Sequence, residues 1–142
     1  MAAAAETRQL AAALRDALRR TYPGAAMQVR AGRTGHRDYI HVRWTDGPAL
    51  NGVQVVADRL ATSAVEGAPS VQPLCLRSYS AAMLRRIAQV WARGFGRDVP
   101  EVVDLARGGP TVRFASPSDH RGFWDVAAAM GAATAGSDTE AA

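Results

Sequence analysis

The sequence lacks lysine, holds a single cysteine, and has few aromatic residues and no long apolar run. The lone Cys75 cannot form an internal disulfide, so nothing requires an oxidising compartment. No apolar run approaches the roughly 20 residues that a membrane-spanning helix needs. The first residues also lack the basic segment and long apolar core of a secretory signal peptide. These absences predict a cytoplasmic protein that does not enter a membrane.

Residues suited to metal binding are few and scattered. His36 and His41 lie in a predicted loop and strand, His120 is distant, and the sequence has neither a cysteine pair nor a His-Glu helix motif. Because a metal site needs converging ligands, this spacing is typical of ordinary surface histidines and predicts no metal. The glycine-containing segments 31–35 and 107–110 miss the spacing of nucleotide-binding loops, which predicts no cofactor.

No nucleophile with a positioned base is evident. Cys75 lies between two leucines, a pattern typical of buried packing, and Ser80 precedes a helical pattern as an N-cap. His41 and Asp46 are the candidate acid–base pair, but Asp46 is expected to serve a turn. The sequence therefore predicts no catalytic residues and a protein that is not an enzyme.

All 17 basic residues are arginine. Arginine suits bidentate contacts to phosphate and stacking on bases, although a GC-rich coding sequence produces the same enrichment. The distribution is more informative, because residues 1–97 hold 14 arginines and 6 acidic residues, whereas residues 98–142 hold 3 and 7. A basic excess confined to the first two thirds of the chain predicts an anionic partner.

The first third of the chain predicts a helix and a strand. Leucines recur at every fourth position from Leu10 to Leu18, which predicts an amphipathic helix over residues 6–20. Residues 25–31 alternate between apolar and polar side chains, as a strand does. Residues 31–38 are basic and glycine-punctuated, and we expect a long connecting loop there.

The next stretch, Tyr39–Pro48, has the clearest strand pattern in the sequence. Its side chains divide with period two into inward Ile40, Val42 and Trp44 and outward Tyr39, His41 and Arg43. Asp46, Gly47 and Pro48 then form a turn that leads into a helix over residues 48–62.

The second half repeats this alternation of helices and strands. Serine, glycine and proline in residues 63–73 predict a loop and the likeliest internal boundary. The segments that follow are predicted as a short strand at 74–76, a helix at 81–93, strands at 101–105 and 111–114, and a helix opened by residues 116–119. Residues 131–142 are small, polar or alanine-rich, and we expect a disordered tail.

The element order is therefore α-β-β-α-(β)-α-β-β-α. It predicts an α+β fold with a mostly antiparallel sheet and helices packed on one of its faces. We expect a single domain over residues 1–130. A duplicated unit is the alternative, because the two halves share an element order.

Several of these segments together resemble a known family. The run Leu18–Gly24, the segment Met27–Arg30, and the run Ile40–Pro48 with its Trp-Thr-Asp-Gly-Pro piece resemble a large polyvalent protein-associated domain. The likeness covers residues 7–62 well and 70–95 loosely. The resemblance implies an α+β accessory domain of phages and other mobile genetic elements, and it brings no catalytic residues.

The predicted hairpin carries the candidate binding site. Arginine, tyrosine and histidine on an open sheet face can contact phosphates and stack on unpaired bases. The candidate nucleic-acid-binding residues are Arg30, Arg33, Arg37, Tyr39, His41 and Arg43. We expect Arg33 and Arg37 in the loop above the strands and the other four on the outer face. DNA or RNA is the expected partner. A solvated polar face is the structural alternative.

A protein-interaction module is the functional alternative. Exposed sheet edges accept a partner strand, and an acidic C-terminal third can pair with a basic face in a homodimer. On this reading the partner is a second copy or another protein, with no nucleic acid bound.

Overall fold

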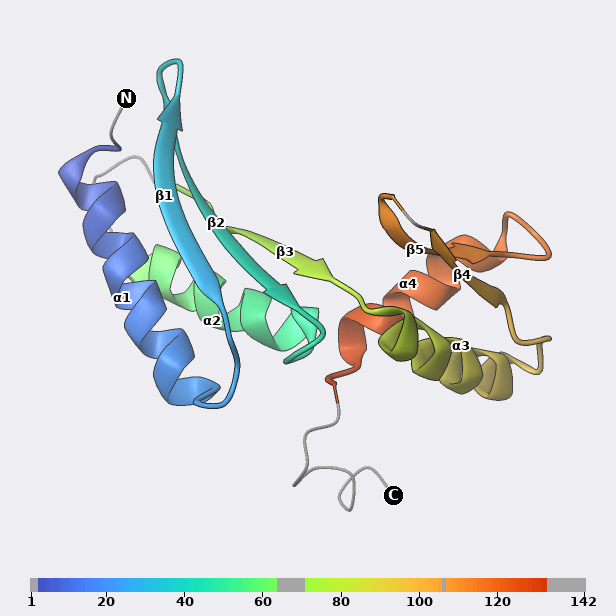
Figure 1. Cartoon of the computed structure of the whole chain (residues 1–142). Helices are drawn as coiled ribbons and strands as arrows, with labels where there is room; N and C mark the ends of the chain where they lie inside the picture. The colour runs from blue at the N-terminus through green and yellow to red at the C-terminus, as the bar shows by residue number, and fades with distance from the viewer. Residues whose placement is uncertain (1–2, 64–70, 106, 133–142) are drawn as a thin grey trace. The chain divides into compact units, whose positions relative to one another are not determined.

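The computed structural model describes residues 3–63, 71–105 and 107–132. The elements are α1 (Ala5–Thr21), β1 (Gln28–Thr34), β2 (Arg37–Thr45), α2 (Leu50–Ser63), β3 (Leu74–Ser78), α3 (Ala81–Phe95), β4 (Glu101–Leu105), β5 (Gly109–Arg113) and α4 (Asp119–Ala129) (Figure 1). The predicted α+β class and the predicted element order are both confirmed.

The chain divides into two compact units. The first holds Met1–Trp44 and Leu50–Arg77, and the second holds Thr45–Ala49 and Ser78–Ala142. The described strands form two sheets, β1-β2-β3 and β4-β5, where the sequence suggested one. The predicted boundary and the predicted tail fall mostly outside the described residues and stay predictions.

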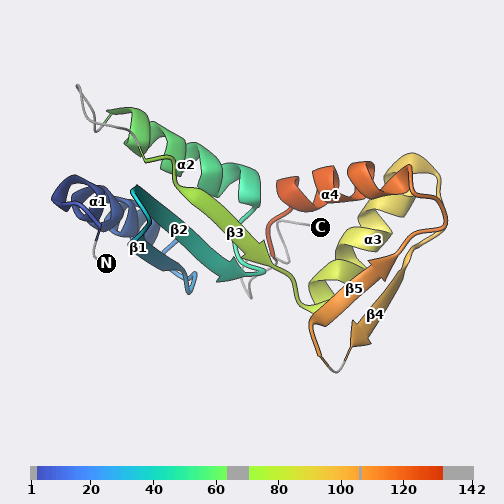
Figure 2. The same ribbon diagram turned by 90° about the horizontal axis from the view of Figure 1, so that it is seen from above.

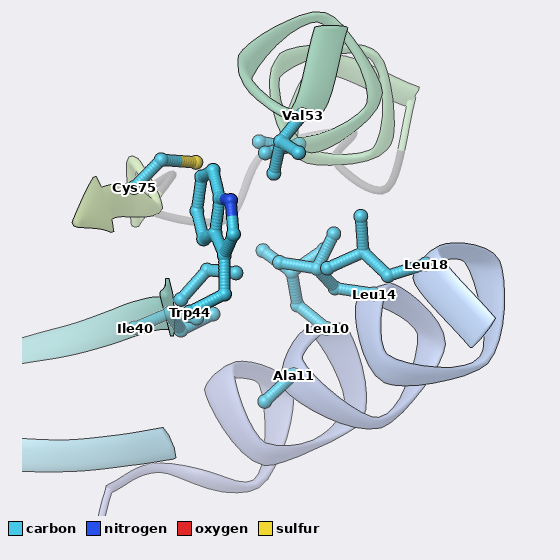
Figure 3. Packing of buried hydrophobic residues seen from close by; sticks show 11 residues of the cluster. Leu10, Ala11, Leu14, Leu18, Ile40, Trp44, Val53 and Cys75 are labelled. Carbon is cyan, nitrogen blue, oxygen red and sulfur yellow. The ribbon is translucent and has the colours of Figure 1, made fainter. Parts of the chain in front are cut away.

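In the first unit, α1 and α2 bury their apolar stripes against β2 and β3. Leu10, Leu14 and Leu18 form the stripe of α1, as their spacing predicted. Figure 3 shows the indole of Trp44 between these leucines, Val53 of α2 and the thiol of Cys75. Burial of these side chains supplies the main stabilisation of the unit.

The sheet of this unit is mixed. β1 and β2 pair antiparallel, while β3 runs in the same direction as β2 in both views (Figures 1 and 2). Helix α2 makes the crossover that a parallel pair requires. With β2 in the centre, β1 and β3 are the edge strands.

The hairpin between β1 and β2 closes much more tightly than the sequence suggested. Thr34 pairs with Arg37, so Gly35 and His36 alone form the turn. Gly35 has φ +62°, the positive value that a type II′ turn needs at its first central position. The prediction of a long loop over residues 31–38 was therefore wrong, because both strands continue through it.

The second unit packs α3 and α4 around an aromatic core. The ring of Phe123, which is fully buried, contacts Trp91, Phe114 and Trp124. Ser80 caps α3 as predicted, since its hydroxyl accepts a 3.1 Å hydrogen bond from the Met83 backbone N–H. No helix of the described residues is long and apolar enough to cross a membrane.

The turn after Trp44 belongs to this second unit. Asp46 has φ 55°, unusual for a residue with a side chain, and Gly47 has φ 48°. The Asp46 carboxylate accepts a 2.8 Å hydrogen bond from the Ser80 N–H, and its own N–H donates to the Ser78 carbonyl. The turn predicted at Asp46 is present, and it also fixes the start of α3.

Candidate functional site

The strand register determines which side chains of the hairpin share a face. On the side of the hairpin that is turned away from the helices, four pairs of residues lie opposite each other: Gln28 and Arg43, Arg30 and His41, Gly32 and Tyr39, and Thr34 and Arg37. We call these eight residues the hairpin face. Five of the six predicted site residues lie on it, namely Arg30, Arg37, Tyr39, His41 and Arg43.

Arg33 lies on the opposite face and is the exception. It pairs with Asp38 across the strands, and its guanidinium Nε lies 2.6 Å from the carboxylate of that residue. Its odd offset from Arg30 turns it toward α1. The placement of Arg33 and Arg37 in a loop was wrong, because both belong to strands.

Asp38 joins the hairpin to the first turn of α1. Its carboxylate accepts hydrogen bonds from the Ala4 backbone N–H at 2.9 Å and from the Thr7 hydroxyl at 2.6 Å. These two donors, together with Arg33, lower the pKa of Asp38 to about 2. A carboxylate at the N-terminus of a helix is also favoured by the helix dipole. The sequence contained no signal for this contact between distant residues.

Tyr39 and His41 form a pair of contacting rings along β2. Their centroids lie 4.6 Å apart with the planes tilted by 35°. The tyrosine ring also extends across Gly32, where an added Cβ atom would lie 2.2 Å from the tyrosine hydroxyl oxygen. Gly32 therefore provides the space in which the Tyr39 ring lies. Both rings are half-buried and keep part of their surface toward solvent.

Two grooves run beside this pair of rings. The basic groove, of about 630 Å³, is lined by Gln28, Arg30, Thr34, Arg37, Asp38, Tyr39, His41 and Arg43. Its three arginines are exposed, and the Asp38 carboxylate is held by α1 and Arg33. Within the part of the chain that the structure describes, these arginines have no carboxylate partner.

The second groove, of about 690 Å³, lies on the other side of the two rings. Its lining joins the first turn of α1, the first half of β2, and the chain that enters β3. Its apolar lining includes Ile40, Val71 and Leu74, and its carboxylates are those of Glu6 and Asp38. Four residues of β2 line both grooves, namely Arg37, Asp38, Tyr39 and His41. β2 is the central strand between β1 and β3, and we call its Tyr39 and His41 rings the ridge.

Cys75, the candidate nucleophile, lies in the core of the first unit and not on the hairpin face. Cys75 is buried, and its desolvation, with the nearby negative charge of Asp58, raises its thiol pKa to about 11. Across residues 3–63, 71–105 and 107–132, no group of three histidine, cysteine or acidic side chains is placed to hold a metal ion.

Comparison with protein-family models matches the first half of the chain. Residues 5–73 match the family model described as Large polyvalent protein associated domain 29. Neither the curated proteins nor the solved structures contain a match to the chain. The looser likeness after residue 73 lies outside the matched segment. For residues 5–73, the match confirms the resemblance to the large polyvalent protein-associated domains, accessory domains of mobile genetic elements, that the sequence indicated.

Proposed function

We propose that the hairpin face binds nucleic acid, as the non-catalytic role of this accessory domain. The observation that carries the proposal is the set of three exposed arginines, Arg30, Arg37 and Arg43, in one groove. Guanidinium groups without carboxylate partners are available to phosphate oxygens, which they bind in bidentate geometry. A face of this charge attracts a polyanion.

The dimensions of the face fit a short stretch of nucleic acid. Arg37 and Arg43 are six residues apart on β2, which corresponds to roughly 20 Å along a strand. Tyr39 and His41 lie between them and offer ring surface to bases. The face thus combines phosphate contacts with aromatic contacts. Both are typical of strand-based nucleic-acid binding.

A salt titration of binding tests the proposal. The probe is a fluorescent oligonucleotide of about 12 nucleotides, and its anisotropy is followed over a range of salt concentrations. Each phosphate contact contributes about −0.7 to the slope of log affinity against log salt, so three arginines predict a slope near −2. The R30A/R43A variant is expected to bind more weakly and to flatten the slope by about 1.4.

The matched control is R20A/R59A. It removes the same charge from exposed positions on α1 and α2, away from the hairpin face, and we expect the slope to stay unchanged. Absence of binding at low salt, or equal slopes in the two double variants, would overturn the proposal.

A protein-interaction module remains the second candidate, because β1 and β3 are edge strands. Part of the β1 edge is covered, since the Arg15 guanidinium donates a 2.9 Å hydrogen bond to the Val29 carbonyl. Molar mass from light scattering over a range of concentrations tests for self-association. A dimer that R30A/R43A disrupts, in a protein without nucleic-acid affinity, would favour this candidate.

A further inference from the structure

The two grooves differ in chemistry on either side of one aromatic ridge. We propose that the ligand is single-stranded nucleic acid whose phosphates lie in the basic groove and whose unpaired bases cross the Tyr39–His41 ridge into the second groove. This inference rests on the proposed nucleic-acid binding and specifies its substrate class.

The charges of the grooves determine where phosphates bind. The basic groove contains Arg30 and Arg43, which do not line the second groove, and Asp38 supplies the one carboxylate among the described residues of its lining. That carboxylate already accepts three hydrogen bonds. The second groove shares Arg37 with the basic groove, and its Arg33 is already paired with Asp38. It also adds the exposed Glu6, whose charge repels phosphate. A strand that enters both grooves therefore places its backbone on the arginine side.

The second groove has the apolar surface that bases need. Leu74, the first residue of β3, is 51% exposed and lines this groove with Tyr39 and His41. Because Cys75 points into the core, strand alternation places Leu74 on the same side of the sheet as the hairpin face. An exposed leucine beside two rings provides apolar contact to the face of a base. The groove volume of about 690 Å³ also lies within the range of pockets that hold small organic groups.

The short length of β3 relative to β2 explains why the second groove exists. β3 has five residues and β2 has nine. Their C-terminal ends are level, since the Asp46 N–H, just after β2, donates to the carbonyl of Ser78, the last residue of β3. The first residues of β2 therefore extend beyond the start of β3, which leaves the space of the second groove beside Tyr39. A base that enters the second groove must be unstacked and unpaired, and the bases of a duplex are neither.

The experiment compares three labelled probes with the wild-type protein. They are a thymidine oligonucleotide, an abasic strand with the same number of phosphates, and a duplex of the same length. We expect the thymidine strand to bind about ten-fold more tightly than the abasic strand, in line with stacking of at least one base. The duplex is expected to bind like the abasic strand, through phosphates alone.

Two variants locate the bases. In Y39A the thymidine-to-abasic affinity ratio is expected to fall to about one, and in L74N it is expected to fall several-fold. The control V55N changes another exposed apolar residue of the first unit, on α2, and should keep the ratio. A ratio of affinities cancels the charge-dependent part of binding, which both probes share. The wild-type comparison needs no variant and stands even where a variant fails to fold.

Each outcome has a distinct meaning. Equal affinity for thymidine and abasic strands, with binding still weakened in R30A/R43A, overturns the base placement and leaves the proposed function standing. A ratio lost in Y39A but unchanged in L74N confines the bases to the ridge and overturns the use of the second groove. No binding to any probe at low salt overturns both proposals.

Discussion

The hydroxyl of Thr7 donates a 2.6 Å hydrogen bond to the carboxylate of Asp38, which joins the first turn of α1 to the hairpin across 31 residues of sequence. Arg33 binds the other oxygen of this carboxylate. The hairpin face therefore depends on a charged contact on its reverse side. Protonation of Asp38 removes its negative charge and weakens the hydrogen bonds that its carboxylate accepts.

The Asp38 contact predicts acid sensitivity of the fold. Its pKa is lowered from 3.8 to about 2, so the unfolded chain takes up the proton first as the pH falls. The stabilisation from Asp38 is fully present above about pH 4 and is lost between about pH 4 and pH 2. Urea unfolding of the wild type and D38N at several pH values measures this. We expect D38N to be less stable near neutral pH and the difference to shrink across that window.

The exposed Asp16 supplies the matched control. Its side chain is 68% exposed and lies 3.6 Å from Arg19. Such a surface pair contributes little, so D16N should follow the wild type at every pH. A D38N difference that is constant from neutral to acid pH would contradict the assigned role of the carboxylate.

The contact between Gly32 and Tyr39 predicts that the effect of G32A on stability changes sign when the tyrosine ring is removed. An alanine Cβ at position 32 would lie 2.2 Å from the Tyr39 hydroxyl oxygen, so the ring has to move. We expect G32A to be neutral or destabilising in the wild type. In a Y39A background the same change should stabilise by about 0.4–1 kcal/mol, because alanine restricts the unfolded chain.

Chemical denaturation of the four proteins measures the cycle. If G32A changes the free energy of unfolding equally with and without the tyrosine ring, Gly32 does not provide the space that the Tyr39 ring occupies. The same variants connect the fold to binding, because a displaced ring also alters the ridge between the two grooves.

The buried thiol predicts low reactivity. Desolvation, with the charge of Asp58, raises the pKa of Cys75 to about 11, so little thiolate exists near neutral pH. Labelling with dithionitrobenzoate at about pH 8 is expected to be slow in the native protein and fast after unfolding in urea. Rapid labelling of the folded protein would contradict the burial of Cys75 in the core of the first unit.

Sequence patterns captured the parts of this structure that are set by local alternation. Ile40, Val42 and Trp44 are buried as predicted, and Ser80 begins α3 as predicted. The sequence does not reveal the tight hairpin turn, because glycines at both 32 and 35 favour a loop. Only Gly35 turns, and Gly32 continues the strand under Tyr39. Extending the alternation from Arg30 would have placed Arg33 on the inner face.

Contacts between distant residues could not be predicted in the same way. Asp38 and Asp46 each accept a hydrogen bond from a residue more than thirty positions away, and no local sequence pattern predicts either partner. The second groove depends on the relative lengths of β2 and β3, which follow from pairing and not from propensity. Sequence alternation places Leu74 in a strand but does not indicate that it is exposed beside the two rings.

The turn at Asp46 predicts an order among three substitutions. Asp46 has φ 55° and its carboxylate accepts a hydrogen bond from the Ser80 N–H. Asparagine tolerates this backbone conformation and keeps an acceptor oxygen, so D46N should cost least. Glycine adopts the conformation but lacks the acceptor, and alanine lacks both advantages. We expect D46A to be the most destabilised, by about 1–3 kcal/mol, with D46G between the two.

Thermal and urea unfolding of the three variants measure this order. S80A separates the two roles of the Asp46 region, because it removes the side-chain cap of α3 and leaves the backbone N–H that Asp46 binds. A loss of about 1 kcal/mol is expected from that cap. Should D46G prove as stable as the wild type, the hydrogen bond to Ser80 contributes nothing, and only the backbone conformation selects aspartate at this turn. Should D46A equal D46G, the left-handed conformation carries no cost, and the hydrogen bond alone explains the residue.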